Sequence, residues 1–332
     1  MRDKSLVTGG AGFIGSHVVN ELIAQGHQVV VLDDLSGGDI KNIHPKAIFE
    51  KGSITDIELV NTLFQKHQFT YVYHLAAYAA EGLSHFIRNF NYNNNLIGSI
   101  NLINASINFD IKCFVFTSSI AVYGTNKSPL SEELHPKPED PYAIAKYAVE
   151  LDLINAKKLF DLDYVIFRPH NVYGAHQNIG DKYRNVVGIF MNQILQDEPL
   201  SIFGDGEQTR AFTYINDVAP YIAKSVCMPE ALNSIFNIGS DQVCTVKKLA
   251  EYVSLAMHAE VKIKQLDKRE EVIHAYASHQ RFDEVFKPNK KTALEQGLIE
   301  MAKWVKENGS RTSSTFKNIE ISKNLPDSWQ EK

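Results

Sequence analysis

The sequence is poor in every feature that would mark an extracellular, membrane or nucleic-acid-binding protein. Its 332 residues include only three cysteines, too few and too scattered for a disulfide framework or a zinc site, which predicts a reducing compartment. No run approaches the roughly 20 apolar residues of a membrane-spanning helix, and the N-terminal MRDKSLVTGG lacks the apolar core of a signal peptide. A net charge of -5 offers no basic excess for nucleic acid. We therefore expect a cytoplasmic protein without metal, membrane or nucleic-acid partners.

What the sequence does contain is a rhythm of short β-branched segments separated by helical ones. These apolar segments occur at 5–9, 28–33, 47–52, 71–76, 113–118 and 164–169. Strands that are apolar on both faces and alternate with helices predict an α/β fold with a doubly wound, parallel, Rossmann-type sheet. The ligand crevice of such a sheet lies beyond the carboxyl ends of its strands. There the sequence places small and polar residues: Gly9, Asp33, Ala76, Ser118 and Asn171.

The segment TGGAGFIG follows the first predicted strand and carries Gly9, Gly12 and Gly15 at intervals of three. Such glycines let a pyrophosphate approach a helix N-terminus, although an ordinary strand-to-helix turn is the alternative. Asp33 closes the second strand about 20 residues later, where a carboxylate can bind the adenine ribose. No Arg or Lys follows closely to take a 2′-phosphate, so the pattern favours NAD over NADP. Asp56 can bind the adenine amino group or cap the next helix, and the two roles can coexist.

The strand and helix rhythm loosens after about residue 175. We expect residues 1–174 to form the NAD-binding domain and residues 175–310 to form a smaller substrate lobe. That lobe includes a further strand, IFNIGS, and segments of the lobe are expected to return to the main sheet. Residues 311–332 form a polar tail with isolated apolar residues, which either stays mobile or docks through them.

The segment PYAIAK begins a long helix, with Pro141 suited to its first turn. Tyr142 and Lys146 are four residues apart and share one helix face, and an exposed pair without function is the alternative reading. In a cleft, the ammonium and a cationic nicotinamide would both favour phenolate. Lowering a phenol pKa from about 10 towards 7 needs roughly 4 kcal/mol, which two positive charges can supply. The pair therefore suits a tyrosine that ionises near neutral pH.

Several ordered motifs together resemble the extended short-chain dehydrogenases/reductases, and more narrowly their nucleotide-sugar epimerase and dehydratase branch. The resemblance runs from about residue 5 to residue 305. It rests on TGGAGFIG, Asp33, HLAA, the serine pair before VYG, Tyr-x-x-x-Lys, RPHNVYG, GDGEQTR and NIGS. It implies an enzyme that binds NAD and a nucleotide sugar, and a homodimer formed through two packed helices, one of them bearing Tyr142.

The resemblance also implies roles for individual residues. Tyr142 would be the catalytic acid/base, Lys146 its electrostatic partner and a ligand of the cofactor ribose, and Ser119 the hydroxyl that shares the substrate proton. The implied cofactor-binding residues are Gly9, Gly12, Phe13, Ile14, Gly15, Asp33, Asp56, Ile57, Leu75, Ala76, Ala77, Asn95, Ser118, Tyr142 and Lys146. The implied substrate-binding residues are Ser119, Asn171, Arg210 and Arg269. Within these sets, Asn95 is expected to support the active-site backbone, and Ser118 can equally be a polar group that supports the turn after its strand.

The residues after the serine pair bear on the reaction. By the resemblance, 4,6-dehydratases carry Asp and Glu immediately before VYG, glucuronate decarboxylases carry Glu, and GDP-mannose 3,5-epimerase has a cysteine at the position of Ala121. Here the two positions are Ile120 and Ala121, which cannot transfer a proton. We therefore expect an NAD-dependent 4-epimerase of a UDP-linked sugar that acts through a 4-keto intermediate. A dehydratase, 3,5-epimerase or dehydrogenase/reductase of the same family and a catalytically silent dinucleotide sensor are the alternatives.

The loop at 77–89 departs from the usual epimerase pattern. Glu81, Ser84 and His85 can contact the hexose or simply face solvent. His85 and His170 are candidates for additional acid/base catalysis, and a structural role is the alternative for each. Because loops assemble the sugar pocket, the sequence leaves the nucleotide base and the sugar undetermined.

Overall fold

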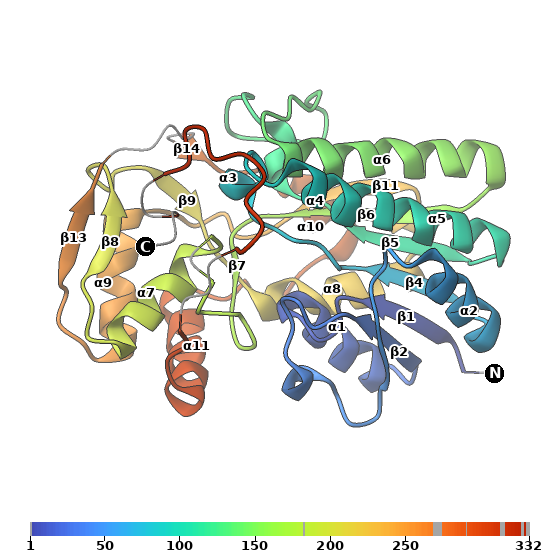
Figure 1. The fold of residues 1–332 in the computed structure, drawn as a ribbon, viewed down its shortest axis with the longest axis horizontal. Helices are drawn as coiled ribbons and strands as arrows, with labels where there is room; N and C mark the ends of the chain where they lie inside the picture. Colours follow the sequence, from blue (N-terminus) through green and yellow to red (C-terminus); the bar gives the residue numbers. More distant parts are fainter. Residues whose placement is uncertain are drawn as a thin grey trace.

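The computed structural model describes residues 2–181, 183–267, 274–289, 291–312, 316–326 and 329. Within them, seven parallel strands form the central sheet in the order β11-β6-β5-β4-β1-β2-β3 (Figure 1). The strands are β1 (Lys4–Thr8), β2 (Gln28–Asp33), β3 (Ile48–Lys51), β4 (Tyr71–His74), β5 (Cys113–Thr117), β6 (Asp163–Pro169) and β11 (Ser234–Ile238). All six predicted strands are present within two residues of their expected bounds, and the doubly wound Rossmann-type fold is confirmed.

Helices cover both faces of this sheet. On one face lie α2 (Ile57–His67), α5 (Gly98–Asn108) and α6 (Pro141–Phe160), and on the other lie α1 (Phe13–Ala24), α8 (Ala219–Lys224) and α10 (Gln280–Phe286). Neighbouring strand residues divide between two cores: Leu6 faces the first helix layer and Val7 the second, and both are fully buried. Burial on both faces explains the uninterrupted apolar strands of the sequence.

The sheet order reverses between β4 and β1, because the chain proceeds to β2 and β3 on one side and to β5, β6 and β11 on the other. Such a switch point leaves a crevice at the carboxyl ends of the strands, where doubly wound proteins bind ligands. The segment IFNIGS supplies β11, which pairs with β6 from Ser234 to Ile238. A segment beyond residue 175 thus returns to the main sheet.

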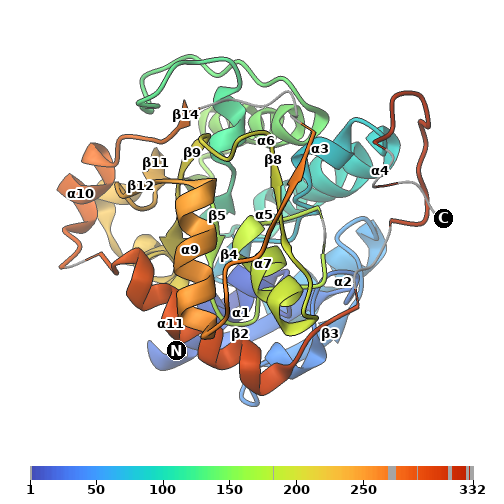
Figure 2. The same cartoon turned by 90° about the vertical axis from the view of Figure 1, so that its left-hand side faces the viewer.

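A smaller lobe packs beside the crevice around its own apolar core. Its helices are α7 (Val186–Leu195), α9 (Val246–Met257) and α11 (Leu294–Asn308), which lie side by side in Figure 2. Its short strands are β8 (Leu200–Phe203) paired with β13 (Ile263–Leu266), and β9 (Thr209–Ala211) between β12 (Val243–Thr245) and β14 (His274–Ala275). A last pair, β7 (Val172–Tyr173) and β10 (Thr213–Tyr214), joins the lobe to the end of β6.

The described part of the C-terminal tail docks on two short helices, α3 (Glu81–Ser84) and α4 (Arg88–Tyr92) (Figure 1). Its apolar residues Phe316, Ile319, Leu325 and Trp329 pack with Tyr78, Phe86 and Phe90. The Glu320 carboxylate accepts hydrogen bonds from the backbone N–H groups of Asn89 and Phe90, at 2.7 and 2.8 Å. Docking through the isolated apolar residues is therefore the tail arrangement observed. Across the described ranges, every helix is too short or too polar to cross a membrane.

Candidate active site

A cleft of about 750 Å³ opens at the carboxyl ends of the strands and extends into the smaller lobe. It brings together most of the residues implied by the sequence. Lining it are Gly9, Gly12, Phe13, Ile14, Gly15, Asp33, Leu75, Ala76, Ala77, Ser118, Ser119, Tyr142, Lys146, Asn171 and Arg210. In the described part of the chain, no group of three or more His, Cys, Asp or Glu residues is arranged to hold a metal ion.

The glycine turn after β1 fits a dinucleotide pyrophosphate. Gly9 has a φ of +73°, and a Cβ there would lie 2.7 Å from the backbone nitrogen of Ala76. A Cβ at Gly15 would lie 2.1 Å from the carbonyl oxygen of Gly9. Gly12 caps α1 without a side-chain hydrogen bond, so the start of this helix lies open to the cleft. Backbone N–H groups and the helix dipole favour an anion at such a place.

Asp33 lies at the end of β2 beside that turn. Its two carboxylate oxygens accept hydrogen bonds from the backbone nitrogens of Ala11, at 3.0 Å, and Leu35, at 2.8 Å. Burial raises the pKa of the Asp33 carboxyl, whereas these hydrogen bonds act in the opposite direction. The residue is thus fixed at the cleft wall, in the position that suits a ribose diol.

Three of the implied cofactor residues do not line the cleft. Asp56 caps α2 by accepting from the Leu59 N–H at 3.0 Å, and Ile57 begins that helix half exposed. Ser53 and Ile54, which follow the end of β3 at Lys51, line the cleft in this stretch of the chain. The cap role weighed for Asp56 is thus present, and its contact with the adenine stays a prediction.

Asn95, the third such residue, is buried behind the cleft. Its Oδ1 accepts from the Tyr78 N–H at 2.8 Å, and its Nδ2 donates to the Tyr78 carbonyl at 3.1 Å. Asn95 Nδ2 also donates to Asn91 Oδ1 at 2.8 Å, and this second hydrogen bond fixes the orientation of the amide. Asn95 thus holds the backbone of a cleft-lining segment, as expected for a supporting asparagine, without lining the cleft itself.

Tyr142, Lys146 and Ser119 converge at the centre of the cleft from two elements. Asp140 caps α6 by accepting from the Ala143 N–H at 2.9 Å, which starts the helix so that Tyr142 and Lys146 face the sheet. Ser119, which follows β5, lies close enough to the Tyr142 hydroxyl to lower its pKa, and its Oγ accepts from the Ala121 N–H at 3.1 Å. Lys146 Nζ donates to the Thr117 carbonyl at 2.8 Å and lies 5.9 Å from the Tyr142 ring centroid. The predicted pair is therefore buried, not exposed.

The electrostatics of this pair differ from the sequence-based expectation. Burial raises the pKa of Tyr142 well above its ordinary value, and the nearby Glu81 carboxylate raises it further. Burial also lowers the pKa of Lys146 to about 7, whereas the negative charge of Glu150 raises that pKa by a smaller amount. Because Lys146 loses much of its own charge, the residues of the chain alone do not favour phenolate. The expected lowering of the Tyr142 pKa thus depends on the charge of the nicotinamide.

Ser118 lines the cleft but points its hydroxyl into the protein. Its Oγ donates to Glu150 Oε1 at 2.5 Å, and Glu150 also pairs with Arg168. Glu150 and Arg168 are 0% and 2% exposed. Of the two roles considered for Ser118, support of the strand end is the one its hydroxyl contact fits, although its other atoms still line the cleft.

The substrate-lobe residues approach the cleft from the end of β6 and from β9. Asn171 has a φ of +43° and donates from Nδ2 to the Ala211 carbonyl at 3.1 Å. Arg210 precedes that carbonyl on β9 and lines the cleft. The predicted Arg269 lies outside the described residues. Asn171 and Arg210, 39 positions apart in the sequence, therefore lie on two segments joined by a hydrogen bond.

The loop at 77–89 contributes one of its three candidate side chains. Glu81 lines the cleft close enough to raise the pKa of Tyr142. Ser84 instead donates to the Glu81 carbonyl at 2.6 Å and to Asp140 at 3.3 Å, and His85 does not line the cleft. His170 is buried behind the cleft wall, so it is not an additional acid or base for the substrate.

Sequence reasoning missed the segment before α7, which lines the cleft with Gln177, Tyr183 and Arg184. The Arg184 guanidinium pairs with Asp181 at 2.9 Å and lies 5.4 Å from the Tyr78 ring centroid. A Cβ at Gly37 would lie 3.2 Å from its Nη2. No local motif marks this segment, because its place opposite the β2 loop depends on how the lobe packs.

Known proteins share this fold and its sequence pattern. The profile of the NAD dependent epimerase/dehydratase family matches residues 5–239. UDP-glucose 4-epimerase from Mycolicibacterium smegmatis is 35% identical over 263 residues, which cover 77% of this chain and 83% of that protein. UDP-N-acetyl-alpha-D-glucosaminuronate decarboxylase from Bacillus cytotoxicus is 31% identical over 330 residues, which cover 92% and 99%. The crystal structure of UDP-glucose 4-epimerase from Thermotoga maritima with UDP-glucose has a TM-score of 0.88 and 35% identity, covering 92% and 99% of the two chains.

Proposed function

Because this chain belongs to the NAD-dependent epimerase/dehydratase family, whose members here act on nucleotide sugars, we propose that it inverts C4 of a UDP-linked sugar. The cofactor is NAD. The observation that carries the proposal is the placement of Ser119 and Tyr142 together in the cleft, with Ile120 and Ala121 directly after Ser119. The pair can move the proton of a hydroxyl, whereas the two apolar side chains offer no group for elimination or decarboxylation.

The mechanism follows from what these side chains can do. Tyr142, as phenolate, accepts the proton of the sugar 4-hydroxyl, and Ser119 donates a hydrogen bond to the oxygen that develops charge. Bound NAD supplies the hydride acceptor for C4 and, as NADH, the hydride donor for the return step. Tyr142 then gives its proton back to the 4-oxygen after the 4-ketose has presented its other face. Lys146 positions the cofactor ribose and adds positive charge when protonated.

Asn171 and Arg210 support a nucleotide diphosphate as the handle of the substrate. An arginine guanidinium donates to two phosphate oxygens at once, and the Asn171 amide lies on the adjoining segment. A diphosphate held by these groups leaves the sugar free to turn within the cleft while it stays bound. The proposed uridine base rests on the relatives, which are named for UDP-sugars. We extend the same proposal to Arg269 as a diphosphate ligand.

We also propose the homodimer, and the division into residues 1–174 and a lobe of residues 175–310 from which α8, β11 and α10 return to the main sheet. Ile144 and Leu151 are 39% and 49% exposed on α6, seven positions apart on one face, and Ile97 is 49% exposed just before α5. Apolar side chains exposed on two neighbouring helices suit an interface with a second copy. Light scattering should give the mass of two chains, and Leu151→Glu should give the mass of one. A single-chain mass for the unaltered protein would refute this arrangement.

The test of the reaction is a substrate panel. Purified protein with NAD is incubated with UDP-, GDP- and dTDP-sugars, and the products are identified by proton NMR. We expect the C4 epimer of at least one UDP-sugar, without net NADH formation. A 4-keto-6-deoxy product or a decarboxylated pentose would identify a different member activity, and steady NADH accumulation would identify a dehydrogenase. NAD binding without conversion of any sugar would favour the silent sensor.

A further inference from the structure

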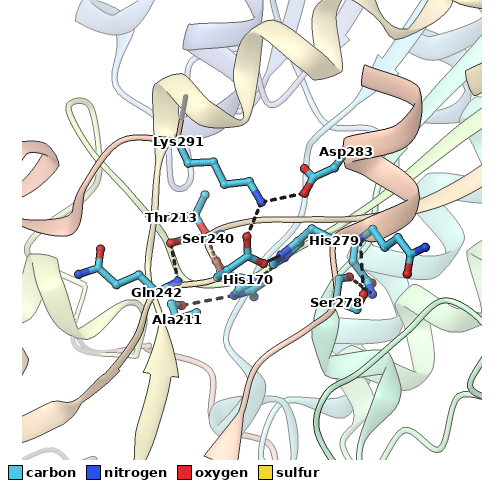
Figure 3. Close-up of polar contacts among 12 residues, drawn as sticks. His170, Ala211, Thr213, Ser240, Gln242, Ser278, His279, Asp283 and Lys291 are labelled. Atoms are coloured by element: carbon cyan, nitrogen blue, oxygen red, sulfur yellow. Dashed lines mark hydrogen bonds and ion pairs between the residues drawn. The ribbon is translucent and has the colours of Figure 1, made fainter. Parts of the chain in front are cut away.

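Two buried histidines from distant segments form a continuous polar chain behind the substrate side of the cleft (Figure 3). His170 follows β6, and its Nε2 lies 2.9 Å from Nε2 of His279, the residue before α10. At one end, His170 Nδ1 lies 3.3 Å from the Ala211 carbonyl oxygen. At the other end, His279 Nδ1 lies 2.6 Å from a carboxylate oxygen of Asp241. Lys291 completes the chain by donating to Asp241 at 2.6 Å.

The protons in this chain can be counted from its ends. A carbonyl oxygen and a carboxylate only accept hydrogen bonds, so His170 Nδ1 and His279 Nδ1 must both carry a proton. The central contact between the two Nε2 atoms needs one more proton, because two lone pairs would repel. Four ring nitrogens therefore hold three protons, and one ring is an imidazolium. Burial lowers the pKa of His170 to about 3, so the charge belongs to His279 beside Asp241.

The surrounding charges fit this assignment. The groups that face the histidine pair are Asp241 after β11, Asp283 on α10 and Lys291 before α11, with Lys291 3.4 Å from Asp283. Two carboxylates and one ammonium leave a charge of -1, which the His279 proton neutralises. The α10 dipole disfavours a cation at the helix start, and Asp241 and Asp283 offset that effect. Both histidine residues are 2% exposed, whereas the Asp241 side chain reaches solvent and can pass the proton.

The ring of His170 also occupies a place that is shaped for it. A Cβ at Gly239 would lie 2.2 Å from His170 Nε2, so only glycine leaves room for the ring at this level. On the other side, Thr213 Oγ1 donates to the His170 carbonyl at 3.1 Å and accepts from the Ser240 N–H at 3.0 Å. His170 is therefore held between the end of β6, the end of β11 and the start of β10.

The Ala211 carbonyl links this chain to the cleft. It accepts from His170 Nδ1 and from Asn171 Nδ2, at 3.3 and 3.1 Å. Arg210, the preceding residue of β9, lines the cleft together with Asn171, whereas neither histidine does. The two histidines can therefore act on a substrate only by fixing the position of the residues that touch it.

We propose that His170 and a protonated His279 are positioning residues that fix the Ala211 carbonyl, and with it Asn171 and Arg210, for the substrate diphosphate. The inference rests on the proposed function only for the identity of that ligand. With one proton fewer, the chain has either two facing lone pairs at the centre or an unprotonated His170 Nδ1 facing the carbonyl. Breaking the chain therefore lowers substrate affinity while the chemical step at Tyr142 continues.

The proton assignment is tested without substrate. The protein is labelled with ¹⁵N-histidine and studied by NMR near neutral pH. One ring should have both nitrogens protonated, and a second ring should have only Nδ1 protonated. In His279→Gln, both sets of signals should be absent or shifted. His258→Gln, on an exposed residue outside the chain, should leave both signals in place. Neutral rings at both His170 and His279 would overturn the assignment.

The positioning role is tested by KM and kcat measured at one pH near neutrality. His279→Gln breaks the chain beside His170, and Asp241→Asn removes the carboxylate beside His279. Both variants should raise KM about fivefold, as for the loss of one hydrogen bond, with kcat close to that of the unaltered protein at the same pH. An unchanged KM in His279→Gln, or a fall in kcat in place of the rise in KM, would refute the role. If no nucleotide sugar or UDP binds although the NMR signals are as expected, the proposed function fails and the proton assignment stands.

Discussion

Arg168 donates two hydrogen bonds to Glu150, from Nε at 2.9 Å and from Nη2 at 2.5 Å, and both side chains are buried between α6 and the sheet. Glu150 lies one helical turn after Lys146, which lies one turn after Tyr142, so the three share one face of α6. The pair thus ties the catalytic helix to β6 and also places a negative charge where it raises the pKa of Lys146.

Removing one partner of this pair should destabilise the fold strongly. Glu150→Gln leaves the Arg168 charge buried without compensation, and the free energy of unfolding should fall by about 3 kcal/mol. Urea unfolding measures the change. The double variant Glu150→Met with Arg168→Met should recover much of the loss, because neither charge remains. As a matched control, Lys248→Ala breaks an exposed pair with Glu251 and should change stability little. A small effect of Glu150→Gln would contradict the importance of the pair.

Tyr142→Phe should lower kcat by about 10³-fold, since it removes the proton-transfer group. Cofactor content and the circular dichroism spectrum should stay unchanged, because the ring still fills its place. Tyr147→Phe is the matched control: its ring is on the same helix but contacts His135, and its activity should match the unaltered protein. Retention of substantial turnover by Tyr142→Phe would rule out the proposed acid/base.

The buried Lys146 should make stability depend on pH. Its folded pKa, about 7, lies below the value of about 10.4 in the unfolded chain, so the unfolded chain binds the proton more tightly in between. The free energy of unfolding due to this group therefore rises from about pH 7 towards pH 10 and is constant below about pH 7. Lys146→Met should lose that rise.

The check is urea unfolding of both proteins at about pH 7 and about pH 9. The stability of the unaltered protein relative to Lys146→Met should increase with pH. Lys248→Met, on an exposed helix surface, should run parallel to the unaltered protein. Parallel curves for Lys146→Met as well would mean that Lys146 keeps an ordinary pKa in the folded protein.

Gly15→Ala should weaken NAD binding by at least about tenfold, equivalent to about 1.4 kcal/mol. The added Cβ would lie 2.1 Å from the Gly9 carbonyl, so the turn that receives the pyrophosphate must open. Calorimetric titration with NAD measures the loss. Gly26→Asn is the control, because nothing lies within 4 Å of its Cβ and asparagine tolerates the positive φ found there. Equal affinity in Gly15→Ala would contradict the assignment of this turn.

The sequence by itself determined the sheet, the glycine turn and the face shared by Tyr142 and Lys146. Each of these depends on local regularity: apolar runs, a glycine spacing of three, and a separation of one helical turn. It also indicated Asn171 and Arg210, through motifs whose segments the fold then joins at the Ala211 carbonyl.

Only the tertiary structure decided which charges and walls surround those residues. It places Ser53 and Ile54 in the cleft wall, whereas Asp56 caps α2 and Ile57 begins that helix. It also brings Arg184 to the β2 loop and joins His170 to His279 across 109 positions. Such contacts leave no period in the sequence, since they arise from packing between segments whose separation along the chain is arbitrary. Burial acts in the same way: it raises the pKa of Tyr142 and lowers that of Lys146, which residue spacing alone does not reveal.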